Sequence, residues 1–215
     1  MPDVIRQFVV VILRGLGQLA FVGTVPGGVL VLLAITLVSP WAAMGALAGA
    51  SIATVVSYWL PVYTRFQWTL GLSGYNAAVI GIFWGHFFAA GHWQIPLFVI
   101  ALGLCLAVEF LLTRFLWRLD LPVLTLPAVV TAYCVAQIYA AMGGWFWGAG
   151  PLLPFGYGGF LLAVMVIVIA MATVSVFATV QAVILSGVTL LFALHIYPLD
   201  AMALIGLWGF TVASA

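Results

Sequence analysis

Long apolar stretches separated by short breaks rich in Gly and Pro run through this chain, and they limit most tightly what it can fold into. Of its 215 residues, 67% are hydrophobic and only 4% are charged, whereas a soluble domain carries roughly 25% charged residues. A soluble fold of this composition would expose far more apolar surface than water tolerates. The chain is therefore predicted to be an all-α integral membrane protein.

The few charged side chains gather where the apolar stretches end, as expected if those ends lie near the membrane surface. A charge at the bilayer centre costs about 3 kcal/mol or more. Arg14 and Glu109 are exceptions, because both fall inside apolar stretches. We expect Arg14 to reach the interface or to contact the C-terminus of a half-helix. Glu109 is expected to form an ion pair with another helix at a subunit contact.

Several classes of function do not fit this composition. The net charge of +1 predicts no nucleic-acid partner. Cys105 and Cys134 both lie in apolar runs, which favours two buried thiols over a disulfide or a metal pair. The spacing of His and carboxylate residues resembles no zinc motif, so neither a metal nor a cofactor is expected. No cleavable signal peptide is predicted, because no polar leader precedes the first apolar stretch.

The apolar stretches differ in length, and a membrane-spanning helix needs about 20 residues. They lie near residues 4–22, 26–39, 41–60, 74–92, 94–117, 121–142, 158–178, 179–197 and 199–215. Several are too short to cross a membrane unaided, 26–39 in particular. Because broken helices are tolerated in a membrane only when buried in protein or lining a cavity, these stretches predict half-helices beside a transport path.

Two pairs of glycine motifs recur in the same order, which predicts an internal duplication. Gly71–Asn76 is echoed by Gly206–Thr211, and Gly27–Leu30 is echoed by Gly158–Leu161. The predicted first repeat covers residues 1–140, and the second begins at 141 and is incomplete at 215. The chain is therefore expected to be either a fragment of a longer protein or a natural short form that completes its pore with another chain.

Four motifs resemble the urea transporter family and follow the family's order. They are Arg14–Phe21, Ser39–Ala42, Gly71–Val79 and Leu121–Pro127. The resemblance implies a channel-like homotrimer in which each subunit has its own pore between two inverted repeats. Each repeat would have five spanning helices and a tilted half-helix. Urea would pass in single file down its gradient through a multi-pass protein of the plasma membrane, here the bacterial inner membrane.

The resemblance also implies an aromatic slot in the pore. By motif position, Phe21 would form one wall, and Tyr75 and Val79 would line the slot from the glycine-rich half-helix. Phe210 would be the counterpart of Tyr75 in the second repeat. A flat slot between aromatic rings suits urea, which is small, planar and neutral, and it excludes bulky or hydrated solutes.

Two polar residues are implied as the hydrogen-bonding partners of urea. Gln18 would lie at one pore mouth, and Thr125 would supply the hydroxyl of the central constriction. Their side-chain oxygens accept hydrogen bonds, which would replace those that urea loses on leaving water. Each residue also has a structural alternative: Gln18 as a bond between helices, Thr125 as a partner for a backbone carbonyl near a kink, and the aromatic residues as ordinary packing.

Departures from the family pattern leave other functions open. The position matching Gln18 in the second repeat falls near 148–150 and has no polar side chain, and Thr211 stands where Asn is usual. One alternative is therefore a channel for another small neutral solute, such as a short amide, ammonia or water. A different alternative is an intramembrane enzyme, which would require Glu109, His86 and His92 to converge in one cavity.

Overall fold

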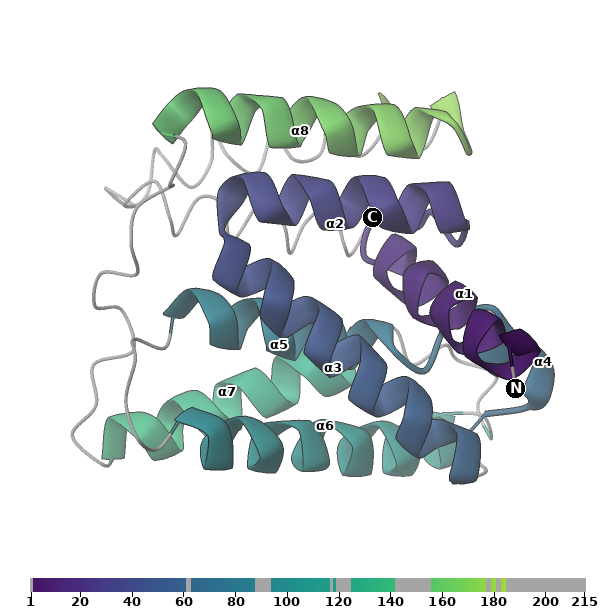
Figure 1. The fold of residues 1–215 in the computed structure, drawn as a ribbon. Helices are drawn as coiled ribbons and strands as arrows, with labels where there is room; N and C mark the ends of the chain where they lie inside the picture. Colours follow the sequence, from purple (N-terminus) through teal and green to yellow (C-terminus); the bar gives the residue numbers. More distant parts are fainter. Residues whose placement is uncertain are drawn as a thin grey trace.

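Helices are the only regular secondary structure in the part of the chain that the computed structural model describes, which confirms the predicted all-α class (Figure 1). The described residues are 2–60, 63–87, 94–116, 118, 125–141, 156–176, 179–180 and 183–184. The helices are α1 (Pro2–Gln18), α2 (Val25–Val38), α3 (Pro40–Trp59), α4 (Arg65–Thr69), α5 (Tyr75–Phe87), α6 (Gln94–Leu116), α7 (Leu126–Ala141) and α8 (Gly156–Ala172). Seven of them fall on predicted apolar stretches, whereas α4 lies in a predicted break.

Local sequence signals explain where α2 and α3 begin and end. The Thr24 side chain accepts a hydrogen bond from the Gly27 N–H and begins α2. The Ser39 hydroxyl accepts one from the Ala42 N–H and begins α3, with Pro40 as the first helical residue. The 14 residues of α2 span about 21 Å, which is less than the roughly 30 Å hydrocarbon core of a bilayer. The prediction that 26–39 is too short to cross alone is thus consistent with the length of α2.

Backbones come into direct contact where α3 packs on α5. A Cβ atom added to Gly45 would lie 2.0 Å from the Gly81 carbonyl oxygen, and one added to Gly81 would lie 1.9 Å from the Gly45 oxygen. One turn further on each helix, Gly49 and Gly85 are equally close to backbone atoms of the facing helix. These are two facing Gly-x-x-x-Gly motifs, a pattern that allows close helix packing in membranes.

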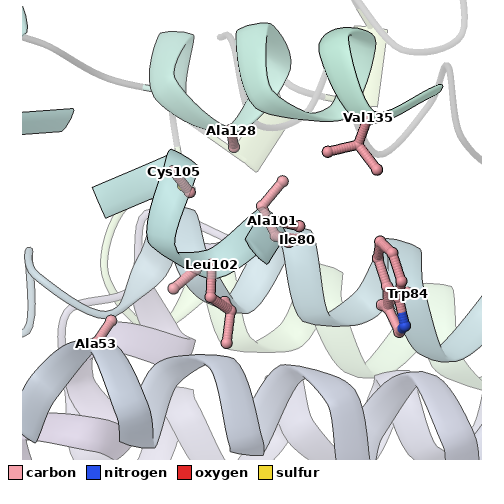
Figure 2. Close-up of a cluster of buried hydrophobic side chains, with 9 residues drawn as sticks. Ala53, Ile80, Trp84, Ala101, Leu102, Cys105, Ala128 and Val135 are labelled. Carbon is pink, nitrogen blue, oxygen red and sulfur yellow. The ribbon is translucent and has the colours of Figure 1, made fainter. Parts of the chain in front are cut away.

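The largest apolar cluster joins α5, α6 and α7, with Ala53 contributed by α3. Figure 2 shows these side chains between the ribbons, with Trp84 and Ile80 from α5 facing Leu102 from α6 and Val135 from α7. The cluster holds α6 and α7 on one side of α5, while α3 packs close to α5 through the glycine motifs. Val79 lies at the edge of this cluster.

A second contact pairs α2 with α8, which lie side by side at the top of Figure 1 and run in opposite directions. Val31 of α2 shares an apolar cluster with Ala170 and Met171 of α8. Both helices carry one of the repeated glycine pairs in the first turn, Gly27–Gly28 in α2 and Gly158–Gly159 in α8. Segments matched by the proposed duplication are therefore neighbours in the fold.

Among the described residues, two helices are long and apolar enough to cross a membrane by length and composition. One is α3 (Pro40–Trp59, mean hydropathy 1.3), and the other lies within α6 (Ile95–Leu116, mean hydropathy 2.6). The α6 helix exposes the large apolar side chains Ile95, Val99 and Leu111. Such a surface suits contact with lipid rather than water.

The two cysteines are placed differently. Cys105 is buried in the apolar cluster of Figure 2, as predicted. Cys134 is exposed on α7, next to Tyr133, which is also exposed. The prediction that both thiols are buried is therefore wrong for Cys134, because only one face of α7 packs against α5 and α6.

Candidate pore site

The C-terminal half of α1 packs directly on the turn that precedes α5. A Cβ atom added to Gly15 would lie 2.9 Å from the Gly71 carbonyl oxygen and 3.5 Å from the Gly74 Cα. Only residues without a side chain allow the two backbones to come this close. Two glycine motifs that are more than 50 residues apart in the sequence therefore meet in space.

Two polar side chains of α1 strengthen this contact. The Arg14 Nη1 donates a hydrogen bond to the Thr69 carbonyl oxygen at 2.8 Å. The Gln18 Nε2 donates to the Leu70 carbonyl oxygen at 3.3 Å. Thr69 is the last residue of α4, so Arg14 contacts the C-terminus of a helix, but that helix lies in a predicted break and is not one of the expected half-helices. Gln18 uses its amide nitrogen here, whereas its predicted role towards urea requires the amide oxygen.

Local signals fix the short α4 helix that presents these carbonyl groups. Thr64 and Gln67 form a capping box at its N-terminus. Gly71 follows its C-terminus with a φ of 84°, a left-handed conformation that favours glycine. Between them lies Trp68, which is buried and packs edge-to-face against the Phe8 ring. Its Nε1 donates a hydrogen bond to the Thr54 carbonyl oxygen. The helix is thereby anchored to both α1 and α3.

Tyr75 and Val79 lie one turn apart at the start of α5, and both are half-buried. Tyr75 directly follows Gly74, which packs against Gly15 of α1. The fold therefore brings the C-terminal end of α1, which carries Gln18, to the turn that leads into Tyr75. Val79 packs against the apolar cluster formed by α5, α6 and α7.

The other predicted pore residues lie on different elements. Phe21 follows α1 in a left-handed conformation (φ 56°), which is uncommon for a residue with a side chain, and is 43% exposed. Thr125 is half-buried just before α7, and its carbonyl oxygen accepts from the Val129 N–H. Phe210 lies outside the described residues.

A buried polar cluster that the sequence did not predict lies beside Tyr75. The Glu109 side chain is 1% exposed. Its Oε1 atom accepts hydrogen bonds from the Tyr63 hydroxyl at 2.5 Å and the Asn76 Nδ2 at 2.8 Å. The expected ion pair is therefore wrong for the described residues, since both partners are neutral donors of the same chain. Asn76 was visible in the glycine motif, but no sequence signal links it to Glu109.

The Tyr63 side chain is suited to remain a donor in this cluster. Burial raises the pKa of the Tyr63 phenol well above its usual range, and the neighbouring Glu109 carboxyl raises it further. The phenol therefore keeps its proton at neutral pH and donates it to the carboxyl oxygen.

Comparison with known proteins now decides the family. The sequence profile described as "urea transporter" matches residues 9–149, which is more than half of the chain. The chain belongs to the urea transporter family. The match runs from the middle of α1 through α7 and includes every predicted pore residue except Phe210.

Curated members of the urea transporter family are clearly similar in sequence. Urea transporter 1 of sheep (Ovis aries) is 34% identical over 124 residues, which are 56% of this chain and 32% of the sheep protein. Urea transporter 1 of mouse (Mus musculus) is 34% identical over 127 residues, 58% of this chain and 33% of the mouse protein. The chain thus matches about a third of the length of these relatives.

Family membership bears on the alternatives raised by the sequence. Urea transporters are membrane proteins that move a solute and are not enzymes, which argues against an intramembrane enzyme. Within the described residues, the partners of Glu109 are Tyr63 and Asn76. The His86 side chain and His92 lie outside the part that the structure describes.

Proposed function

We propose that this protein provides a passive, channel-like path for urea down its concentration gradient. The observation that carries the proposal is the packing of α1 on the turn before α5. In a member of the urea transporter family, this contact brings Gln18 to the glycine motif that leads into Tyr75. Gln18 and Tyr75 belong to separate pore motifs, and the contact between those two motifs supports a shared site.

The proposed path combines shape selection with hydrogen bonding. Tyr75, Val79, Phe21 and Phe210 would form an aromatic-lined slot that admits a flat, uncharged amide. The Gln18 amide oxygen at the mouth and the Thr125 hydroxyl at the constriction would accept the N–H groups of urea. Acceptors at fixed places replace the hydrogen bonds lost on dehydration, so that urea enters without a large desolvation cost.

The proposed architecture is a pair of inverted repeats, one over 1–140 and one beginning at 141. The antiparallel packing of α2 on α8 supports it, because these helices carry matching glycine pairs in the first turn and run in opposite directions (Figure 1). The short α2 and α4 helices are candidates for the broken elements that line a transport path. A homotrimer in the plasma membrane, with one pore per subunit, completes the proposal.

Stopped-flow permeability measurements on proteoliposomes test the choice of solute. The protein is expected to raise the permeability to urea well above that to methylurea and glycerol. If water or ammonia is conducted while urea permeability equals that of protein-free liposomes, the channel serves another small neutral solute. The absence of a polar side chain near positions 148–150, where the second repeat would match Gln18, is the observation that favours this second candidate.

A further inference from the structure

One carboxyl oxygen holds both ends of the segment that carries the candidate pore motif. This segment, 63–76, contains α4, the glycine turn and Tyr75. Tyr63 at its start and Asn76 at its end both donate to the Oε1 atom of Glu109. The bonds connect residues that are 46 and 33 positions from Glu109 in the sequence. The ends of the segment are therefore tied to the same point on α6.

The middle of segment 63–76 is hydrogen-bonded to a different helix, α1. Arg14 and Gln18 donate to the carbonyl oxygens of Thr69 and Leu70. Segment 63–76 is thus connected to α6 at its ends and to α1 at its centre. Residues outside a functional site often form hydrogen bonds that fix the segment supporting it. Such bonds hold the functional side chains within a fraction of an ångström of their working positions.

Stability alone does not explain a carboxyl group at this place. Glu109 is 1% exposed, and Cys105, one turn earlier on the same helix, is fully buried in the apolar cluster. Replacing both partners of a buried hydrogen bond by apolar groups of the same shape can be nearly neutral or stabilising. Apolar residues at positions 63, 76 and 109 together would fill the space without the desolvation cost of a carboxyl, whereas Met at position 109 alone would remove the acceptor of Tyr63 and Asn76. The carboxyl contributes something that an apolar side chain cannot, namely two directional bonds to segment 63–76.

We propose that Glu109 is a positioning residue for the solute path. Through its bonds to Tyr63 and Asn76, it fixes the start of α5 and so the place of the Tyr75 ring, which determines the width of the slot. The inference rests on the proposed function, because Tyr75 matters to selectivity only if it lines the path. Loss of the two bonds should make the slot less selective while the helical bundle remains folded.

Glu109→Met and Glu109→Gln separate the positioning role from general packing. Both donors use the same oxygen of Glu109, so the single amide oxygen of Gln can accept both bonds. Glu109→Met is expected to lower urea permeability about tenfold and to raise the methylurea-to-urea permeability ratio. Glu109→Gln should restore both quantities to nearly the wild-type values. Cys105→Ala, one turn away in the same buried face, is the control and should leave the ratio unchanged.

The outcomes separate the two claims. Urea permeability of the wild-type protein at the lipid background contradicts the proposed function itself. If the wild-type protein conducts urea and a folded Glu109→Met variant keeps the wild-type methylurea-to-urea permeability ratio, only the role of Glu109 is overturned. The role is also overturned if Glu109→Gln shows the same urea permeability and the same ratio as Glu109→Met. If Glu109→Met does not fold, Tyr63→Phe decides, because it removes one donor and little volume. A raised ratio in Tyr63→Phe supports the inference, and the wild-type ratio overturns it.

Discussion

Side chains that form the proposed path differ in how directly the structure connects them. The motifs that carry Gln18 and Tyr75 meet through Gly15 and Gly71 and through the hydrogen bond from Gln18 to the Leu70 carbonyl. Thr125 sits at the start of α7, where its backbone carbonyl accepts from the Val129 N–H. Its proposed role depends on the hydroxyl, which can be removed without changing the size of the side chain.

Thr125→Val is expected to lower urea permeability roughly tenfold, because urea would lose a hydrogen-bond acceptor at the narrowest point. The measurement is stopped-flow urea flux in proteoliposomes, normalised to the amount of folded protein. Thr36→Val is the matched control. The Thr36 hydroxyl donates to the Leu32 carbonyl within α2, so its removal should leave the flux unchanged. Equal fluxes for Thr125→Val and the wild type would remove Thr125 from the path.

At the scale of elements, the α3–α5 pair is the part of the fold most sensitive to small substitutions. Its facing glycines leave no room for a methyl group, since a Cβ at Gly81 would overlap the Gly45 carbonyl. The α5 helix also carries Tyr75, so the separation of α3 and α5 affects both the stability of the bundle and the place of the candidate site.

Gly81→Ala should lower the free energy of unfolding by roughly 1–3 kcal/mol, because the helices must move apart to fit the methyl group. Thermal unfolding in detergent measures the change as a lower transition temperature. Gly103→Ala on α6 is the control, since nothing lies within 4 Å of the Cβ it would add. That variant should be neutral or more stable by up to about 1 kcal/mol, because Ala favours helix more than Gly. Similar transition temperatures for both variants would contradict the close packing of α3 on α5.

The elements that the sequence predicted well are those whose signals are local. The boundary at Ser39–Pro40 follows from a capping side chain and a proline, and the all-α class follows from hydropathy. The α4 helix was not predicted, because its five residues are too few for a periodic pattern. The partners of Glu109 were not predictable either, since both lie more than 30 residues away and are neutral. Charge pairing was the only signal available, and it indicated the wrong kind of partner.

For the whole molecule, α3 gives the most direct indication of how the chain sits in a bilayer. Trp41 and Trp59 lie near its two ends and are 63% and 78% exposed. The 18-residue separation corresponds to about 27 Å along a helix, close to the hydrocarbon thickness of a bilayer. Trp is enriched at both membrane interfaces, so we expect one interface at each end of α3.

Spin labels on cysteines introduced at positions 41, 52 and 59 test this placement. Ile52 is exposed and lies towards the middle of α3, so its label should be accessible to oxygen and protected from a polar relaxing agent. The labels at 41 and 59 should show the reverse. The background variant would carry Cys105→Ala and Cys134→Ala, so that no native thiol is labelled. Equal accessibility at all three positions would contradict a transmembrane α3.

The central claim is that this member of the urea transporter family conducts urea passively, and isotopic exchange tests it most directly. Proteoliposomes of the purified protein would hold equal urea concentrations on both sides, with no ion gradient and no ATP. Passive conduction predicts that labelled urea enters much faster than in protein-free liposomes and reaches the same concentration inside and outside. Entry at the protein-free rate, or entry only when an ion gradient is imposed, would contradict it.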